Sequence, residues 1–254
     1  MVIILSPSKT IDTDKVTSKL YTKPLFLNQS SNIIGKLKKY NTQELSQLMS
    51  ISSKLSQLNY DRYQHWNEDH NLSNSKQAIL SFKGEVFTGL NAATFSDEDL
   101  EYSQGHLIIL SGLYGALRPL DLIQPYRLEI STKLSLDGTA NLYNYWQSNI
   151  AKSINNELKN HNDNTIINLA SLEYFKTIDL SCLEADVITP VFKDFKDGKY
   201  KIISIYAKKA RGLMSHYIIK NKIEKVGELK LFDQEGYYYN DILSNNQQLI
   251  FTRG

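Results

Sequence analysis

Short aliphatic runs, each followed at once by a polar or basic loop, recur along the sequence. The clearest are residues 2–5 (VIIL), 107–110 (LIIL) and 165–170 (TIINLA). Short apolar runs bounded by turn-forming residues are typical of strands buried on both faces of a sheet. Helical patterns separate these runs, and the longest covers residues 141–159. The pattern therefore favours a mixed α/β fold, with a central mixed sheet flanked by helices.

Composition is consistent with one folded unit. The chain has 254 residues, of which 41% are hydrophobic and 22% charged, as in ordinary globular domains. Neither an internal repeat nor a low-complexity linker divides it, so we expect a single domain over residues 1–254. The formal net charge of +2 is too small to attract a polyanion, and a nucleic-acid site would need local clustering of lysine and arginine.

The first residues and the cysteine content indicate a cytoplasmic protein. The apolar run at residues 2–5 is too short for a signal peptide or a membrane span, and no later run approaches about 18 residues. We therefore expect no membrane partner. Cys182 is the single cysteine, which excludes an intrachain disulfide and favours a reducing compartment. Its neighbours give no sign of thiolate activation, so we expect it to be a small buried residue.

Residues 107–130, LIILSGLYGALRPLDLIQPYRLEI, carry an unusual concentration of polar groups after a strand. Two prolines and two glycines cannot lie inside one regular element, so the backbone must turn after the strand and cross the surface. The loop contains Tyr114, Arg118, Tyr126 and Arg127. Loops at strand ends often hold ligand sites. A structural crossover with incidental charges explains the stretch equally well.

Residues 31–66 contain apolar residues at helical spacing, interrupted by short breaks. Asn41 and Glu44 have the spacing of a capping box, and Asn59 is expected to end a helix before another begins at Tyr60. A run of short helices is what a helix-hairpin-helix element requires. An ordinary helical layer has the same periodicity and is the commoner structure.

Basic residues follow several of the expected strands, including strands expected at residues 78–82 and 201–206. If these strands are parallel neighbours, their ends converge on one edge, and the cations line one cleft suited to phosphates. The alternative is dispersed, solvated surface charge. The cations are Lys9, Lys83, Arg118, Arg127, Lys208, Lys209 and Arg211.

Familiar enzyme motifs are absent. The sequence contains no P-loop, and SGLYG matches neither the serine-elbow pattern nor the dinucleotide fingerprint. His65 and His70 lack the spacing of a zinc helix, and the scattered histidines suggest no metal or cofactor site. Glu129 and Glu173 each follow a strand or loop near the expected cleft. Either could be a general base, but a salt bridge to a neighbouring arginine is the simpler role.

Together these motifs resemble the YaaA family of peroxide-stress-resistance proteins. The resemblance extends over essentially the whole chain and consists of short segments in the same order. The segments are SPSKT (6–10), FKG (82–84) with TG (88–89), LSGLYG (110–115), RPLDL (118–122), PYRLE (125–129), NLAS (168–171) with EYF (173–175), and YAKKARG (206–212).

The resemblance implies a cytoplasmic bacterial protein that limits hydrogen-peroxide damage and is linked to lower free iron and to DNA repair. It also implies a mixed α/β fold particular to the family, with a basic cleft and a helix-hairpin-helix element. We assign that element to residues 41–66 as a prediction. The family has no established catalytic residues, so none can be transferred to this chain.

Our first hypothesis is a sequence-independent binder of duplex or branched DNA without a demonstrated enzymatic activity. The seven cations would hold phosphates, and Tyr114 and Tyr126 would stack on an exposed base. A shallow groove that spans several phosphates would favour this hypothesis.

The second hypothesis is an enzyme acting on a nucleotide or nucleobase in the same cleft. Arg118 and Arg127 would clamp the ligand, and Glu129 or Glu173 would serve as the base. A pocket deep enough for one nucleotide would favour this hypothesis.

Overall fold

The computed structural model describes residues 1–14, 18–136 and 138–254. These residues form one large mixed sheet of eight strands, in the order β11-β12-β9-β8-β1-β5-β6 with β10 paired to β9, and two small two-stranded sheets. The strands of the large sheet are β1 (Val2–Leu5), β5 (Leu107–Ser111), β6 (Gly115–Leu117), β8 (Thr165–Asn168), β9 (Asp186–Lys196), β10 (Lys199–Lys201), β11 (Tyr238–Tyr239) and β12 (Gln248–Arg253). The predicted mixed α/β fold is confirmed.

β1 lies in the middle of the sheet, between two parallel neighbours. Ile3 is the partner of Leu107 in β5 and of Ile167 in β8. Every residue of β1, β5 and β8 is buried, as the continuous aliphatic runs predicted. Because the three strands are parallel, the loops that follow β1 and β8 leave the sheet at the same edge.

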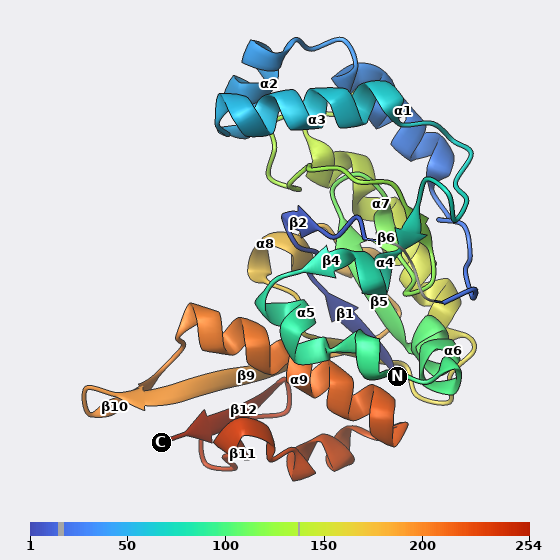
Figure 1. Cartoon of the computed structure of the whole chain (residues 1–254). Helices are drawn as coiled ribbons and strands as arrows, with labels where there is room; N and C mark the ends of the chain where they lie inside the picture. The colour runs from blue at the N-terminus through green and yellow to red at the C-terminus, as the bar shows by residue number, and fades with distance from the viewer. Residues whose placement is uncertain (15–17, 137) are drawn as a thin grey trace.

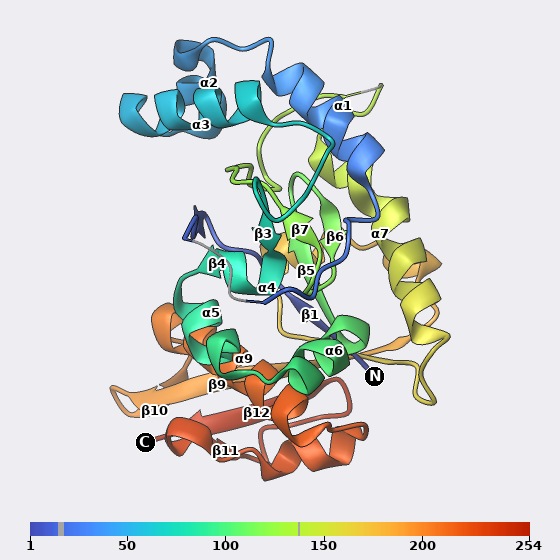
Figure 2. The same ribbon diagram turned by 45° about the vertical axis from the view of Figure 1, so that its right-hand side comes forward.

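Helices cover both sides of the sheet. α6 and α7 pack against β1, and α9 packs against β9; Figure 2 shows α7 on the other side of β1 from α5 and α9. None of the described helices is both long and apolar enough to cross a membrane. The α-helices are α1 (Leu27–Leu37), α2 (Thr42–Met49), α3 (Ser53–His65), α4 (Ala78–Ser81), α5 (Glu85–Leu90), α6 (Asp97–His106), α7 (Leu142–Leu158), α8 (Leu172–Phe175) and α9 (Ser204–Asn221).

α1, α2 and α3 form a separate helical layer, at the top of Figure 1 and away from β9 and β12. The predicted capping box is confirmed: the Asn41 side chain accepts from the Glu44 amide, and the Glu44 carboxylate accepts from the Asn41 amide. The break predicted at Asn59 is wrong. The helix α3 runs through Asn59 to His65, and the Asn59 side-chain amide donates to the Leu55 carbonyl 2.8 Å away. The helix-hairpin-helix assignment stays a prediction.

Two short strands predicted from apolar runs are absent. Residues 78–82 mostly form α4, and residues 201–206 divide between the end of β10 at Lys201 and the start of α9 at Ser204. Short apolar runs do not distinguish a strand from a buried helical turn, and packing decides between them.

Cys182 is exposed rather than buried, because it ends a surface 3₁₀ helix (Leu180–Cys182).

Two short antiparallel pairs stand apart from the main sheet. β2 (Thr10–Ile11) pairs with β4 (Phe82–Lys83), and β3 (Lys76–Gln77) pairs with β7 (Leu122–Ile123). The first pair carries the loop after β1 toward Lys83 and Gly84. It therefore brings two basic loops together although their strands are not neighbours in the main sheet.

Candidate functional site

A cleft of about 390 Å³ lies at the edge of the sheet where β1 and β8 end. Five cations and three carboxylates line it, together with serine hydroxyls and a few apolar side chains. The charged residues that line it are Lys9, Lys83, Arg127, Lys208, Arg211, Glu85, Glu129 and Glu173. The predicted convergence therefore holds for five of the seven candidate cations and for both candidate carboxylates.

Hydroxyl groups join the two strand ends at the base of the cleft. The Ser6 hydroxyl, just after β1, accepts a hydrogen bond from the Ser171 amide at 2.8 Å and lies 3.2 Å from the Ser171 hydroxyl. Ser171 also caps α8 through the Tyr174 amide. These bonds bring Lys9 and Glu173, which are far apart in the sequence, to the same cleft.

Glu129 occupies the centre of a small ion-pair network. Its carboxylate lies 2.6 Å from Lys9 Nζ and 2.9 Å from an Arg127 terminal nitrogen. The Nε of Arg127 is buried and has no hydrogen-bond partner among the described residues. The Arg127 carbonyl accepts from the Tyr63 hydroxyl, which connects the cleft to α3. Glu129 is thus a salt-bridge partner of a neighbouring arginine, and it partly neutralises two cations.

Arg211 supplies positive charge that no carboxylate neutralises. It lies in α9, half-buried against the cleft, and no described carboxylate is within ion-pair distance of its guanidinium. Burial lowers the pKa of Arg211 from its ordinary value, which reflects the cost of placing a cation there. Lys208 lies one turn earlier in α9, exposed on the same cleft. An anion in the cleft would stabilise both.

Lys83 is held at the rim by Asp12. The Asp12 carboxylate lies 3.0 Å from the Nζ atoms of both Lys83 and Lys76. A hydrogen bond from the Asp14 amide is the main cause that keeps the pKa of Asp12 well below its ordinary value, with the two lysines contributing. Lys83 is nevertheless largely exposed, so it can reach a ligand at the cleft mouth.

Two of the predicted cations lie elsewhere. Arg118 donates to Asp121 at 3.0 Å and to the Lys23 carbonyl at 3.2 Å, because the turn after β6 points it away from the cleft. Lys209 pairs with Glu235 on the other side of α9 from Lys208 and Arg211. Helical spacing accounts for this separation, since a residue next to Lys208 in sequence lies about 100° around the helix.

Tyr114 and Tyr126 are buried, with 0% and 4% of their surface exposed. The Tyr114 hydroxyl accepts from Trp66 Nε1 at 3.0 Å, and the Tyr126 hydroxyl lies 2.6 Å from the Ser111 hydroxyl. The Tyr114 ring offers no exposed face to a base in this structure. Tyr126 contributes only to the floor of the cleft.

Several cleft residues are missing from the sequence-based prediction. Ser6, Ser171 and Tyr174 line the cleft, as does Glu85 at the start of α5. Ser6 directly follows β1 and Ser171 lies three residues after the end of β8, so the rule that selected Lys9 could also have selected them. Glu85 carries no comparable signal.

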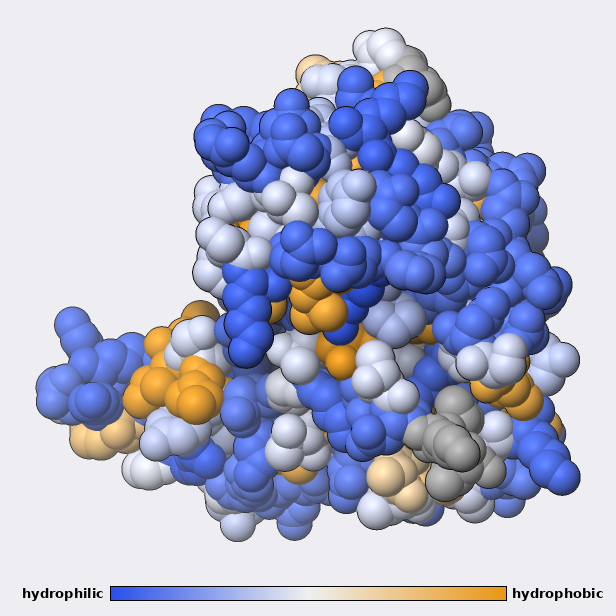
Figure 3. Space-filling view, turned by 45° about the horizontal axis from the view of Figure 1, so that its top comes forward, coloured by the Kyte–Doolittle hydropathy of each residue, from blue (hydrophilic) through white to orange (hydrophobic). Residues whose placement is uncertain are grey.

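The face shown in Figure 3 is mainly hydrophilic, and an apolar area lies on the projecting part at its left.

A second cluster lies outside the cleft. His106, His161 and Glu224 each place one ligand atom within 4.8 Å of the other two. The sequence predicted no metal-ligand set, because the three residues are far apart along the chain. Folding brings them together.

The comparisons with known proteins agree over the full chain. A family model described as "Peroxide stress protein YaaA" matches residues 1–243. A "UPF0246 protein" from Saccharophagus degradans is 51% identical over 254 residues, covering 100% of this chain and 99% of the relative. A "UPF0246 protein" from Teredinibacter turnerae is 49% identical, with the same coverage. One from Clostridium botulinum (strain Alaska E43) is 48% identical over 256 residues, covering 99% of each chain. The chain therefore belongs to the YaaA family of peroxide stress proteins.

Proposed function

We propose that this chain binds DNA through the basic cleft and so protects or helps to repair it during peroxide stress in the cytoplasm. The observation that carries the proposal is Arg211, a half-buried cation without a carboxylate partner, on the same helix face as Lys208. Burying a cation is unfavourable unless an anion compensates it. Arginine binds phosphate oxygens through two parallel hydrogen bonds, so phosphate is a suitable partner.

The remaining lining suits a nucleic-acid backbone. Lys9, Lys83 and Arg127 surround the same space, and serine hydroxyls can donate to phosphate oxygens without reading sequence. The proposed partner is therefore duplex or branched DNA without sequence preference. The lowering of free iron that the family resemblance implies would be a separate activity, since a basic lining repels Fe²⁺.

The test is a titration of fluorescent duplex and four-way-junction DNA at several salt concentrations. Phosphate contacts release counterions, so binding should weaken steeply as salt rises. Lys208→Ala/Arg211→Ala should bind roughly tenfold weaker or worse at low salt. It should also reduce the slope of log affinity against log salt by about 2, or about 0.9 per lost phosphate contact.

A matched control removes the same charge elsewhere. Lys152→Ala/Lys159→Ala changes the exposed surface of α7 and its C-cap, away from the cleft. Its affinity should stay within about twofold of the parent protein. Equal weakening in both double variants would show that only net charge matters and would contradict a cleft site. A salt-independent affinity would contradict phosphate binding altogether.

The size of the cleft favours a second candidate function, an enzyme acting on one nucleotide or nucleobase. About 390 Å³ lies within the usual range of small-molecule pockets. Glu173 faces the same space, and its carboxylate accepts from the Ser131 hydroxyl at 2.7 Å, so it has a fixed orientation. In this alternative Glu129 or Glu173 acts as general base while Arg127 and Arg211 hold the phosphate.

Chromatography of nucleotides and damaged duplexes after incubation with the protein tests this alternative. Turnover that disappears in Glu173→Gln or Glu129→Gln, with ligand binding retained, would support it. If the parent protein forms no product for as long as it stays folded in the assay, DNA binding remains the proposed function of the cleft.

A further inference from the structure

The cluster of His106, His161 and Glu224 lies at the opposite end of the sheet from the cleft. His106 ends α6 and directly precedes β5, His161 follows α7 and precedes β8, and Glu224 follows α9. The cleft lies beyond the other ends of β1 and β8, so a strand of four residues, about 13 Å, separates the two places. The proposed DNA site and this cluster are therefore independent.

The hydrogen bonds of both imidazoles determine which nitrogen is free. His106 Nδ1 lies 2.8 Å from the Tyr102 carbonyl, and His161 Nε2 lies 2.8 Å from the Gly105 carbonyl. A carbonyl oxygen only accepts, so both of these ring nitrogens carry hydrogen. In neutral rings this leaves a lone pair on His106 Nε2 and on His161 Nδ1. Metal-binding histidines are typically oriented in this way, with the other N–H donated to a backbone carbonyl.

The free nitrogen of His106 faces a carboxylate. His106 Nε2 lies 3.0 Å from Glu224 Oε1. If the ring is neutral, the lone pair of Nε2 faces a lone pair of this carboxylate oxygen, and the two repel. Either a proton or a cation must lie between them. Two atoms that bind one ion at about 2.1 Å are roughly 3.0–3.5 Å apart, which matches this distance.

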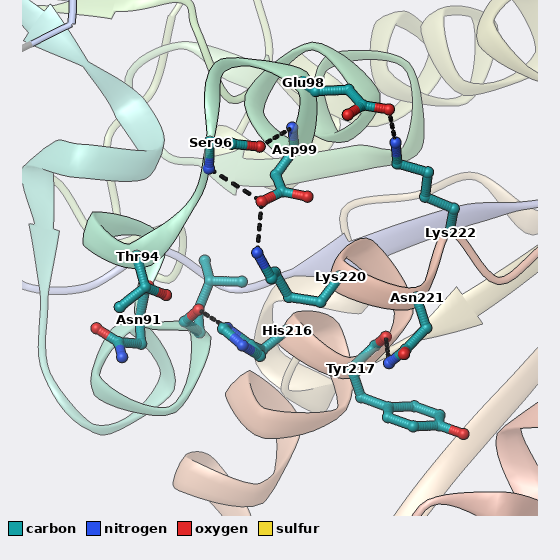
Figure 4. Close-up of polar contacts among 11 residues, drawn as sticks. Asn91, Thr94, Ser96, Glu98, Asp99, His216, Tyr217, Lys220, Asn221 and Lys222 are labelled. Carbon is teal, nitrogen blue, oxygen red and sulfur yellow. Dashed lines mark hydrogen bonds and ion pairs between the residues drawn. The ribbon is translucent and has the colours of Figure 1, made fainter.

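The surrounding elements hold these side chains in place. The Tyr102 ring stacks on His106 with centroids 3.8 Å apart, and its hydroxyl donates to Glu224 Oε1 at 3.0 Å. Figure 4 shows how α9 is attached to the start of α6: Lys220 pairs with Asp99, and Lys222 with Glu98. The segment that carries Glu224 is thereby fixed against α6.

Backbone electrostatics also favour a cation at this position. The carboxyl ends of α6, α7 and α9 meet here, and each presents the negative end of a helix dipole. The Glu224 side chain is 52% exposed and that of His106 is 16% exposed. An ion could therefore enter from solvent and keep water ligands on its open side.

We propose that His106, His161 and Glu224 bind one divalent first-row transition-metal ion. Two imidazoles and one carboxylate with open positions are the ligands that Fe²⁺, Zn²⁺ and related ions accept in proteins. His106 Nε2, His161 Nδ1 and Glu224 Oε1 are the ligand atoms, and the Tyr102 and Gly105 carbonyls orient the two rings. The remaining coordination positions belong to water.

The test is calorimetric titration of the tag-free full chain with Zn²⁺, and with Fe²⁺ under anaerobic conditions. Co²⁺ absorption spectroscopy then reports ligand type and coordination number. We expect one ion per chain and visible Co²⁺ bands of nitrogen and oxygen ligation. Glu224→Gln, which changes a half-exposed side chain and preserves its shape, should weaken binding by about tenfold or more, as should His161→Gln.

His65→Gln is the matched control, because His65 is exposed and lies outside the cluster. It should bind the metal as the parent protein does. Circular dichroism and thermal unfolding without metal check that the variants are folded. Absence of stoichiometric binding would show that the cluster is an imidazolium–carboxylate pair and overturn the proposal. Binding that survives both Glu224→Gln and His161→Gln would also overturn it.

Discussion

At the scale of single residues, the cleft depends on which charges are neutralised within the protein and which are not. Glu129 contacts Lys9 and Arg127, whereas Arg211 has no carboxylate partner among the described residues. The carboxylate thus competes with any anionic ligand for two of the five cations. Removal of the Glu129 carboxylate should therefore strengthen phosphate binding, whereas it should abolish turnover if Glu129 is a general base.

Replacing Glu129 with glutamine removes that competition. If the cleft binds phosphates, Glu129→Gln should tighten DNA binding by roughly twofold to fivefold, the usual range for a partly exposed ion pair. Fluorescence anisotropy at low salt measures the change. Glu101→Gln, an equal change of charge on the exposed face of α6, should leave affinity unchanged. Weaker binding by Glu129→Gln would contradict the prediction and mean that the carboxylate orients Lys9 and Arg127 for the ligand instead of competing with it.

Two glycines determine how closely α5 approaches α9. A Cβ at Gly212 would overlap the Val86 carbonyl and lie 2.7 Å from the Leu90 amide nitrogen. A Cβ at Gly89 would overlap the Lys209 carbonyl. Because the obstacles are backbone atoms, neither site can adjust by side-chain rotation.

Gly212→Ala should therefore lower the free energy of unfolding by about 3 kcal/mol or more. Urea unfolding followed by circular dichroism measures the loss. Gly35→Ala is the control: nothing lies within 4 Å of a Cβ there, and alanine in α1 should add up to about 1 kcal/mol. Equal stability of Gly212→Ala and the parent protein would refute close packing of α5 on α9.

At the scale of secondary-structure elements, α2 depends on its first turn. It has eight residues and one buried side chain, Leu45. Burial therefore contributes little, and the Asn41–Glu44 capping box satisfies amides that would otherwise lack partners. A short helix with little burial is sensitive to its cap.

Asn41→Ala should lower the free energy of unfolding by about 1 kcal/mol. Gln43→Ala, on an exposed position of the same turn, should change it by less than about 0.5 kcal/mol. Chemical denaturation of both variants gives the comparison. If the two substitutions cost the same, the capping bonds contribute nothing and the prediction fails.

At the scale of the whole molecule, a buried polar network joins the helical layer to the central loop. His70 is 1% exposed; its Nε2 lies 3.0 Å from the Tyr114 hydroxyl, and that hydroxyl accepts from Trp66 Nε1. The side-chain nitrogen Nε2 of Gln124 lies 3.3 Å from His70 Nδ1. Burial lowers the pKa of His70 below its ordinary value, so the folded protein keeps it neutral.

Stability should therefore depend on pH in a definite direction. In the unfolded chain His70 has a pKa of about 6.5, so below that pH the unfolded state binds the extra proton. The contribution of His70 is fully present above about pH 6.5. It is lost as the pH falls through the lowered folded pKa, by at most about 1.4 kcal/mol per pH unit. Urea unfolding between about pH 7.5 and about pH 5 measures this slope, which should be smaller in His70→Gln. An identical slope in both proteins would rule out His70 as its source.

Much of the fold follows from local sequence. The runs at residues 2–5, 107–110 and 165–170 form β1, β5 and β8, because continuous aliphatic residues are stable only where both faces of a strand are covered. The hairpin that joins β9 to β10 turns at Asp197 and Gly198, residue types that tolerate the positive φ found there. Residues 78–82 and 201–206 were predicted as strands, but 78–81 are helical and 204–206 begin α9, since short apolar runs fit either structure until neighbours pack on them.

The candidate site divides in the same way. Local patterns in the sequence predict that basic loops follow buried strands, and parallel neighbours then bring Lys9 and Glu173 to one edge. Long-range packing turns Arg118 and Lys209 away from the cleft, buries Tyr114, and brings His106, His161 and Glu224 together. The physical reason is that strand periodicity and turn chemistry act between near neighbours in the chain. Contacts between residues far apart depend on how whole helices pack against the sheet.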